Sequence, residues 1–542
     1  MGNRACGFLR PKLNCATMSE LIRYNYLHSQ TESTTGYFSC LPDPLPGAAE
    51  LLRLLAERPL DSFLRRYAIG VFAGRETEVF SDESPLLHPR RATLPDAPLH
   101  AAWAEVFNSN IQGHKKIIVQ DLPPLFTPEL LERHAQEPKI GLADLPTVTS
   151  EPESLMPAAE VAELALERLQ KAGALAGPEQ RHIASLSPIA LLMPWKLDIA
   201  VRDGRNSYSL KGQANTYGRG LSLAQCRASC RMEMVERFSA YLSIADGEVK
   251  DRAAPAPLKH ARRSEFLERG EAALDPNEFY IEAPYLDQEL VWISGLEARR
   301  ASPDAAAYRP VWVPLQMAAL FSNCDEIDLA SAPGSTGIAT GSVMEQARLA
   351  ALTEILERDA EATTLYHKSR CFQLDPDSVG DEALAALLYD YRALGINLQF
   401  MDLTGPLGLP CYQAFVIGPK GGMHRGHGAS LSGPRAVVSA ISETPYPYPE
   451  GGPSGPMLRN LPLRRLSDLP DYSSGSVKSD LALLESMLCA NGLNPVYVEL
   501  THATLKFPVV RALIPGRQLA ADFDDFTRLS PRLYKDYLKL IG

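Results

Sequence analysis

Several features that define other protein classes are missing from this 542-residue sequence. Its nine cysteines include no Cys-x-x-Cys pair, which argues against a zinc ribbon and a disulfide framework and favours reduced thiols. The net charge is -11 and no Lys/Arg run is present, so nucleic acid is not expected as a partner. No stretch approaches the ~20 apolar residues of a membrane span, and no secretory signal pattern opens the chain. These absences predict a cytoplasmic protein without a membrane partner.

What is present is typical of a large globular protein. The hydrophobic share of 45% and the charged share of 22% exclude disorder throughout. The length exceeds what one core usually supports, and helical periodicity after Pro157 followed by a break at 173–180 suggests a boundary. We therefore expect an N-terminal domain over 1–155, a connecting helix and linker over 156–180, and a main domain over 181–542. Short β-branched and aromatic segments, such as 412–417 and 509–514, alternate with helical patterns, so the predicted class is mixed α and β.

One motif occurs twice, 121 positions apart in the numbering of the sequence. Each copy ends in Glu-x-x-Glu-Arg within a helical pattern, so two carboxylates share one helix face beside a guanidinium. Such acid pairs suit divalent cations, which in turn bind phosphates. The first copy is Gly220, Gln225, Arg227, Glu233, Glu236, Arg237, and the second is Gly341, Gln346, Arg348, Glu354, Glu357, Arg358.

The faces of these two predicted helices favour a site over ordinary surface salt bridges. In both, small residues lead into the acids, for example Ala350 and Ala351 before Glu354. A solvated face would carry Lys, Glu and Gln throughout. Buried carboxylates need a partner or a metal, and each motif supplies one arginine for two acids. The simpler alternative, two pairs of helix salt bridges, stays open at this point. So does a metal pair at Cys226 and Cys230, although two small core residues are the favoured interpretation.

Glycine clusters precede both predicted helices, at 218–220 and 334–341. Glycines at a helix entrance let backbone N–H groups meet an anion such as phosphate, although a tight turn without a ligand explains them equally well. A third, fainter copy runs from Gly426-His427-Gly428 to Glu443 on a helix-like segment. His424 and His427 flank that turn; titration near neutrality is one interpretation, and loop histidines without a role are the favoured one.

Taken together, these segments resemble the YcaO family. The resemblance rests on the order and spacing of motifs over roughly residues 205–516. They are Gly218-Arg219-Gly220 through Glu236-Arg237, Ser335-Thr336-Gly337 through Glu357-Arg358, the turn at 426–429 with Glu443, and Pro508-Val-Val-Arg511 with Pro515-Gly516.

The resemblance implies a YcaO-type ATP-binding fold with mixed sheets and packed helices, using ATP and Mg²⁺. It implies phosphorylation of a backbone amide oxygen in a peptide or protein, which leads to azoline, thioamide or related products. A partner protein for substrate docking or sulfur delivery is a further expectation, and a homodimer is a candidate assembly. Carried over by position, the metal ligands are Glu233, Glu236, Glu354 and Glu357. The ATP contacts are Arg219, Arg237, Ser335, Thr336, Gly337, Glu354 and Arg358, and the catalytic candidates are Glu443 and Arg511.

Three departures from the family pattern matter. Arg219 stands where the family often has lysine, which keeps the charge. Around Glu443, the sequence has Ser439, Tyr446 and Tyr448 where the family usually has Arg, Gln and Arg, so two charges are missing and turnover is in question. The chain also ends without the Pro-x-Pro-x-Pro tail of azoline-forming members. A non-catalytic accessory protein is therefore the alternative, and a di-iron helix protein is disfavoured because no helix-borne Glu-x-x-His is present.

Overall fold

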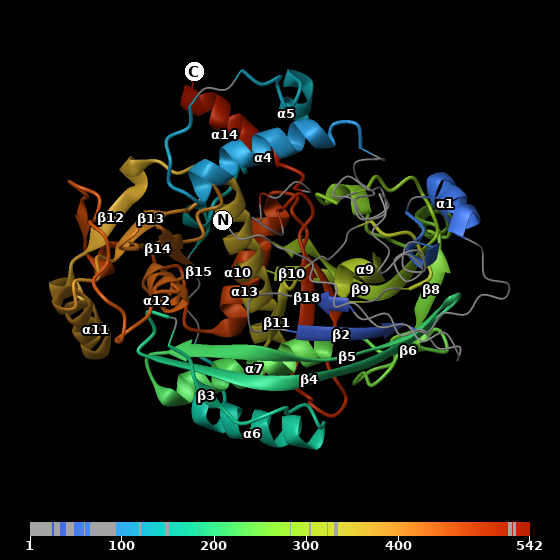
Figure 1. Ribbon diagram of the computed structural model, residues 1–542, viewed down its shortest axis with the longest axis horizontal. Helices are drawn as coiled ribbons and strands as arrows, with labels where there is room; N and C mark the ends of the chain where they lie inside the picture. The colour runs from blue at the N-terminus through green and yellow to red at the C-terminus, as the bar shows by residue number, and fades with distance from the viewer. Residues whose placement is uncertain are drawn as a thin grey trace.

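The computed structural model describes residues 24–26, 33–38, 48–58, 60–64, 94–118, 121–146, 151–183, 185–281, 283–302, 305–321, 324–329, 334–518, 523 and 527–541. Within these ranges the strands form three sheets, with helices packed between and around them (Figure 1). The mixed α and β class expected from the sequence is therefore observed. Among the helices of these ranges, each is too short or too polar to cross a lipid bilayer.

The first sheet is built on a long antiparallel hairpin. Strand β4 (Ile189–Asp203) pairs along its whole length with β5 (Asn206–Gly220). Every second side chain of β4 from Trp195 to Val201 is buried, which is the alternation expected of a strand with one covered face. The remaining strands follow in the order β1-β2-β5-β4-β6-β7 with β3 beside β4: β1 (Tyr24–Tyr26), β2 (Ser33–Phe38), β3 (Gln180–Arg181), β6 (Ile244–Ala245) and β7 (Glu248–Val249).

The second and third sheets come from the later part of the chain. The second has the order β10-β9-β17-β18-β11 with β8 beside β9: β8 (Leu258–Ala261), β9 (Leu290–Ser302), β10 (Ala305–Pro314), β11 (Ile338–Thr340), β17 (Val496–Glu499) and β18 (Val509–Leu513). The third has the order β15-β14-β13-β12-β16: β12 (Cys371–Leu374), β13 (Gln399–Asp402), β14 (Cys411–Ile417), β15 (Met423–Ala429) and β16 (Leu463–Arg464).

Each sheet contributes one strand that turns directly into a helix packed against it. Strand β5 leads into α7 (Leu223–Ala240), β11 into α10 (Met344–Thr363), and β15 into α12 (Gly433–Glu443). These three strand–helix units are the two copies of the sequence motif and its fainter third copy. The acid pairs predicted on helices therefore lie on α7 and α10, and Glu443 is the last residue of α12.

Glycines allow the strand and the helix of a unit to approach closely. A Cβ on Gly218 of β5 would lie 2.1 Å from the Cys226 carbonyl oxygen of α7, and one on Gly428 of β15 would lie 2.2 Å from that of Ala436 in α12. The glycines at 218–220 and 426–428 are thus strand residues. The interpretation of 426–428 as a turn was wrong, and so was that of His424 and His427 as loop histidines, because both lie on β15. Cys226 and Cys230 are buried core thiols facing β5, and Cys226 Sγ donates to the Gly218 carbonyl.

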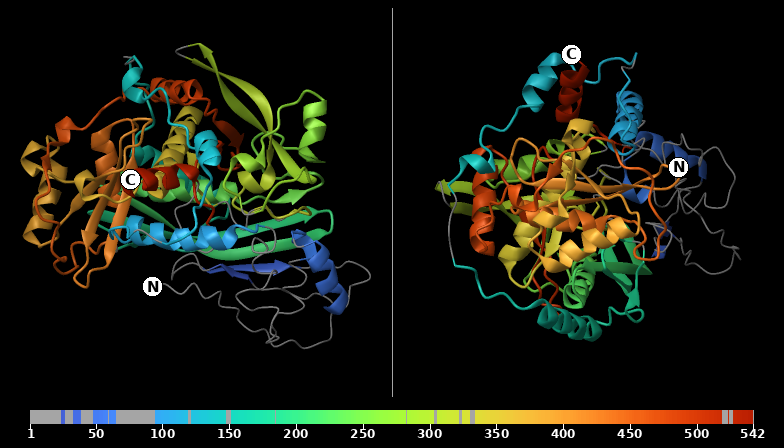
Figure 2. Two further views of the ribbon diagram at one scale, coloured as in Figure 1. Left: turned by 90° about the horizontal axis from the view of Figure 1, so that it is seen from above. Right: turned by 90° about the vertical axis from the view of Figure 1, so that its left-hand side faces the viewer.

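Segments from the N-terminal 155 residues pack against the later chain. Strand β2 pairs with β5, and β1 pairs with β2, so these blue strands extend the first sheet beyond its long green hairpin (Figure 2). Trp103 of α4 (Ala97–Ile111) contacts the rings of Tyr534 and Tyr537 on α14 (Pro531–Ile541) at 5.1 and 5.0 Å between centroids. Helix α5 (Pro128–His134) also packs on α14. The predicted domain boundaries at 155 and 180 stay predictions.

The remaining helices complete the layers. The predicted connecting helix is α6, which packs on α7 through Arg231, whose Nη1 donates to the Ala162 carbonyl at 2.9 Å. The proline-rich stretch 445–456 is loop. The other helices are α1 (Ala48–Glu57), α6 (Ala158–Lys171), α8 (Arg263–Glu268), α9 (Leu315–Ala318), α11 (Glu382–Ala393) and α13 (Val477–Ala490).

Candidate active site

The acids of α7 are held by their own strand and their own arginine. Glu233 Oε2 accepts a hydrogen bond of 2.8 Å from the backbone N–H of Tyr217 on β5. Arg237 lies between the two acids, 3.6 Å from Glu233 and 3.3 Å from Glu236. One guanidinium therefore serves two carboxylates, as the motif predicted, and the group carries an excess of negative charge.

The acids of α10 are held in the same way, by backbone N–H groups. Glu354 Oε2 accepts from the N–H of Gly337, 3.1 Å away, just before β11. Glu357 Oε2 accepts from the N–H of Ala429 at the end of β15, at 2.8 Å. Arg358 does not neutralise either acid at contact distance, because its Nη1 pairs with Glu361 at 3.1 Å. Glu357 thus ties the second unit to the strand of the third.

Glu443, at the end of α12, is the acid that the third unit contributes. It forms an ion pair with Arg219 at the end of β5. Its negative charge raises the pKa values of both Glu233 and Glu357, so it lies near an acid of each of the other helices. The three units therefore converge on one acid cluster, which we define as Glu233, Glu236, Glu354, Glu357 and Glu443.

Burial dominates the electrostatics of this cluster. It raises the pKa of Glu233 and Glu354, and that of Glu236 well above its usual range, where the charge of Glu354 adds to the effect. Burial, with the charges of Glu354, Glu443 and Glu361 adding, raises the pKa of Glu357 to about 8. Desolvated carboxylates that repel one another favour protonation unless a cation joins them. The cluster is therefore suited to receive positive charge.

Arg511 lies beneath the acids and is fully buried on β18. Its Nη1 donates to the carbonyl of Gly334 at 2.8 Å, which fixes the loop that carries Ser335, Thr336 and Gly337. Burial lowers its pKa to about 10, while the charge of Glu354 acts in the opposite direction. Gly337 has a φ of +81°, which favours glycine, and a Cβ there would lie 2.5 Å from the Ala512 carbonyl oxygen. This placement fits Arg511 better as a group that orients the loop and the acids than as a phosphate contact.

Sequence reasoning missed a further acid on the same face of α10. Glu361 follows Glu354, Glu357 and Arg358 at helical spacing, a signal present in the sequence. It lies 3.6 Å from Nδ1 of His427, whose pKa burial lowers to about 4. His427 in turn contacts Gln413 at 3.0 Å. His427 is thus a buried, neutral neighbour of the acids.

The arginines at the start of the two motif copies serve packing. Arg227 pairs with Glu179 at 3.0 Å. The guanidinium of Arg348 lies over the rings of Tyr308 and Tyr497, 4.6 and 4.9 Å from their centroids. The repeat therefore combines structural arginines with site arginines.

The residues that depart from the family pattern near Glu443 have other partners. Tyr446 is buried and donates to the Gly452 carbonyl at 2.9 Å, and Tyr448 donates to Asp390 at 2.7 Å. Ser439 is exposed on α12. The two tyrosines therefore stabilise the loop after α12, and neither replaces the charge of the missing residues.

The donor set fits magnesium held jointly with a phosphate ligand. No group of three or more His, Cys, Asp or Glu within the described ranges is arranged to hold a metal ion alone. Mg²⁺ usually takes only one or two carboxylates and completes its octahedron with phosphate oxygens and water. Pairs of half-buried acids with raised pKa values match that requirement, because a cation would relieve their mutual repulsion.

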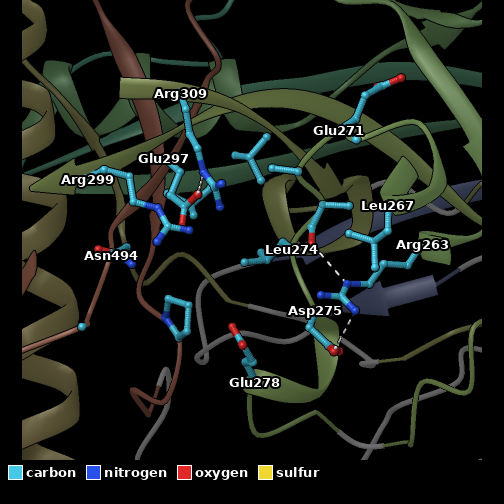
Figure 3. A pocket seen from close by; sticks show the side chains of 17 residues that line it. Arg263, Leu267, Glu271, Leu274, Asp275, Glu278, Glu297, Arg299, Arg309 and Asn494 are labelled. Atoms are coloured by element: carbon cyan, nitrogen blue, oxygen red, sulfur yellow. Dashed lines mark hydrogen bonds and ion pairs between the residues drawn. The ribbon is translucent and has the colours of Figure 1, made fainter. Parts of the chain in front are cut away.

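A separate cavity of about 490 Å³ lies on the second sheet (Figure 3). Glu297 on β9 is opposite Val496, which is opposite Leu513, two residues beyond Arg511. Directly paired residues and alternate residues share a sheet face, so the cavity opens on the face that carries Arg511. Its charges pair mainly with one another: Glu297 with Arg299 at 2.8 Å and with Arg309, and Arg263 with Asp275 at 3.3 Å. With three arginines and four carboxylates in its lining, the cavity presents mixed charge without an excess of cations.

Comparison with known proteins identifies the strand–helix units. Residues 217–445 match the family described as YcaO cyclodehydratase, ATP- and Mg²⁺-binding. All the predicted ATP and metal ligands fall in this range, and Arg511 lies outside it. The chain therefore carries a YcaO domain, as the resemblance predicted, and ATP and Mg²⁺ are the cofactors of this domain.

Relatives are distant and extend the likeness beyond that range. An uncharacterized protein of Methanothermobacter thermautotrophicus is 24% identical over 336 residues, which are 56% of this chain and 81% of that protein. An uncharacterized protein in the tfuA 3′ region of Rhizobium leguminosarum bv. trifolii is 24% identical over 340 residues, which are 56% of this chain and 76% of that protein.

Among solved structures, a heterocyclase in complex with substrate and cofactor superposes with a TM-score of 0.52 at 16% identity. The match covers 72% of this chain and 55% of that chain. The YcaO-type fold is confirmed by this likeness, while the shared length is about half of the heterocyclase.

Proposed function

We propose that this protein uses ATP and Mg²⁺ to phosphorylate a backbone amide oxygen in a peptide or protein substrate. The observation that carries the proposal is the acid cluster, in which the carboxylates of α7 and α10, with raised pKa values, lie beside Arg219, Arg237 and Glu443. An amide is a poor electrophile and its oxygen is a poor leaving group. Transfer of the γ-phosphoryl group to that oxygen, with release of ADP, removes both obstacles.

The residues take the following roles in this proposal. Glu233, Glu236, Glu354 and Glu357 hold Mg²⁺ on the phosphates. Arg219, Arg237 and Arg358 stabilise negative charge that develops during transfer. The loop of Ser335, Thr336 and Gly337 contacts the nucleotide, with Arg511 behind it. Glu443, half exposed and already paired with Arg219, is the acid best placed to meet the substrate.

The product class is the finer part of the proposal. A nucleophile then adds to the activated amide carbon and phosphate leaves, which gives an azoline with a Cys, Ser or Thr side chain and a thioamide with sulfide. The similar heterocyclase supports azoline formation. We leave the nucleophile to experiment, with both products as outcomes, in a cytoplasmic setting.

The site is tested by calorimetry of MgATP binding. We expect Glu233→Gln and Glu354→Gln to weaken binding by about tenfold or more, as loss of groups that organise a metal site commonly does. Glu167→Gln on the exposed face of α6 is the matched control and should bind like wild type. Equal affinity in all four proteins would refute the acid cluster as the MgATP site.

An accessory role is the second candidate, and Ser439, Tyr446 and Tyr448 favour it because they supply no charge near Glu443. In that case the protein binds MgATP through the same acids but assists another modifying enzyme. Release of ADP in the presence of its cognate peptide would support catalysis. Tight MgATP binding without ADP release, with or without that peptide and its partner protein, would support the accessory role.

A further inference from the structure

A second cavity, of about 600 Å³, lies on the far side of α10 from the acid cluster. Four residues of α10 line it: Leu356, Asp359, Ala360 and Thr363. Each stands two positions after a residue of the opposite set, Glu354, Glu357, Arg358 and Glu361. Because each residue advances the helix by about 100°, the two faces point in nearly opposite directions. The C-terminal helix α14 and the loop 404–409 form the other walls. The volume is in the range of small-molecule sites, about 300–1,000 Å³.

The charged residues that line this cavity do not balance. Its five cations are Arg370, Arg517, Arg532, Lys535 and Lys539, and its three carboxylates are Glu137, Asp359 and Asp536, which leaves +2. The chain as a whole carries -11. The excess is therefore local, in contrast to the mixed cavity on the second sheet.

Two guanidiniums converge on a single carboxylate in the wall of the cavity. Asp359 is buried, with Arg517 Nη1 at 3.2 Å and Arg532 Nη1 at 2.9 Å. One carboxylate cannot neutralise both. The side chain of Arg517 is only 9% exposed, and its Nε–H is buried without an acceptor in the part of the chain that the structure describes. Burial and the neighbouring charge of Arg532 lower the pKa of Arg517, despite its contact with Asp359.

Two more cations of the lining donate to neutral backbone carbonyls. Arg370 donates one long hydrogen bond, 3.4 Å, to the Thr404 carbonyl. Lys535 donates to the Ala135 carbonyl at 2.7 Å, a neutral acceptor. Apolar side chains complete the wall, among them Leu356, Leu407 and Leu409. A ligand that fits has a doubly negative head and an apolar body.

We propose that this cavity binds a phosphate-bearing small molecule, with its phosphate between Arg517, Arg532 and Lys535 and its organic part against the leucines. A phosphate group carries about -1.5 to -2 charge near pH 7, which matches the local excess, and arginine forks bind its oxygens in pairs. The inference does not depend on the proposed function, because it concerns the opposite face of α10.

Calorimetry without magnesium tests it, with phenyl phosphate, orthophosphate and benzoate as probes. We expect phenyl phosphate to bind at least about tenfold more tightly than orthophosphate, because burial of a phenyl ring adds more than 1.4 kcal/mol. Weaker binding of benzoate would establish phosphate over carboxylate. If orthophosphate binds as tightly as phenyl phosphate, the site is one for the free phosphate ion. Absence of binding by every probe up to about 10 mM would overturn the proposal.

Variants locate the binding. Arg370→Gln and Lys535→Gln remove cations at the opening without disturbing the Asp359 pairs, and each should weaken phenyl phosphate binding about five- to tenfold. Lys171→Gln on α6, at the opposite end of the molecule in Figure 1, is the matched control. Glu354→Gln should leave phenyl phosphate binding unchanged even where it abolishes MgATP binding. Loss in Glu354→Gln together with retention in both cavity variants would place the probe at the acid cluster and refute the second site.

Discussion

Glu357 on α10 accepts a hydrogen bond of 2.8 Å from the backbone N–H of Ala429, the last residue of β15. This contact joins the second strand–helix unit to the third. The ion pair of Arg219 with Glu443 joins the first unit to the third. The first and second units meet where the charge of Glu354, in addition to burial, raises the pKa of Glu236. The acid cluster is therefore one point at which the three sheets are connected.

The first prediction concerns the pH dependence of stability without ligand. Burial raises the pKa of Glu357 from 4.5 to about 8, so the folded protein keeps a proton that the unfolded chain releases. Between these values the free energy of unfolding contributed by this group falls as pH rises. Glu357→Gln keeps an acceptor for Ala429 and cannot ionise. Relative to wild type, the free energy of unfolding of this variant should rise by about 4 kcal/mol between pH 5 and pH 8.5.

Urea unfolding at the two pH values measures this difference. Glu167→Gln serves as the control, because its exposed side chain should change stability equally at both. If the free energy of unfolding of Glu357→Gln differs from that of wild type by the same amount at pH 5 and at pH 8.5, the raised pKa of Glu357 is contradicted. MgATP should reverse the trend in wild type, since cation binding requires the ionised carboxylate.

The second prediction concerns the close approach of strand and helix in the first unit. Gly218→Ala would place a Cβ 2.1 Å from the Cys226 carbonyl oxygen and 2.5 Å from the Cys230 Cβ. Both neighbours belong to the packed helix and cannot move freely. We expect a loss of about 3 kcal/mol or more in the free energy of unfolding.

Gly380→Ala is the control for that substitution, because nothing lies within 4 Å of its added Cβ. It should change the free energy of unfolding by less than about 1 kcal/mol. Chemical denaturation of both variants gives the comparison. A Gly218→Ala protein as stable as Gly380→Ala would show that α7 can shift away from β5.

The third prediction concerns Asp359, which anchors the C-terminal segment to α10. Arg517, Arg532 and the backbone N–H of Gln518 all donate to this buried carboxylate. Asp359→Asn leaves two buried guanidiniums without a counter-charge, and it should cost about 3–5 kcal/mol of unfolding free energy. Asp198→Asn, which breaks the exposed pair with Lys211, should cost less than about 1 kcal/mol. Similar losses in the two variants, measured by urea denaturation, would refute the anchoring role.

The sequence predicted the helices of the site because their signal is local. Glu233, Glu236, Glu354 and Glu357 stand at helical spacing beside small residues, and the family resemblance added Glu443 and Arg511. Their convergence depends on pairing between segments more than 200 residues apart, such as Arg219 with Glu443. Periodicity within one segment carries no information about such contacts.

The errors have a common physical cause. Gly426 and Gly428 are glycines because α12 packs directly on β15, and glycine in a strand was interpreted as a turn. His427 was therefore assigned to a loop, although it is buried beside Glu361. The sequence also does not distinguish Arg227 and Arg348 from the arginines beside the acids. Only the structure shows that Arg227 pairs with Glu179 and that Arg348 lies over two tyrosine rings.

The backbone hydrogen bonds of Glu233, Glu354 and Glu357 have a consequence for metal selectivity. Each uses one carboxylate oxygen on an N–H group, of Tyr217, Gly337 and Ala429 respectively. The other oxygen of each does not share this contact, so the arrangement favours monodentate binding of a cation by these acids. Ca²⁺ requires six to eight oxygens and commonly takes bidentate carboxylates, whereas Mg²⁺ is satisfied with one or two single oxygens and phosphate. If these acids are the ligands, as we propose, the strands that hold them favour the smaller ion.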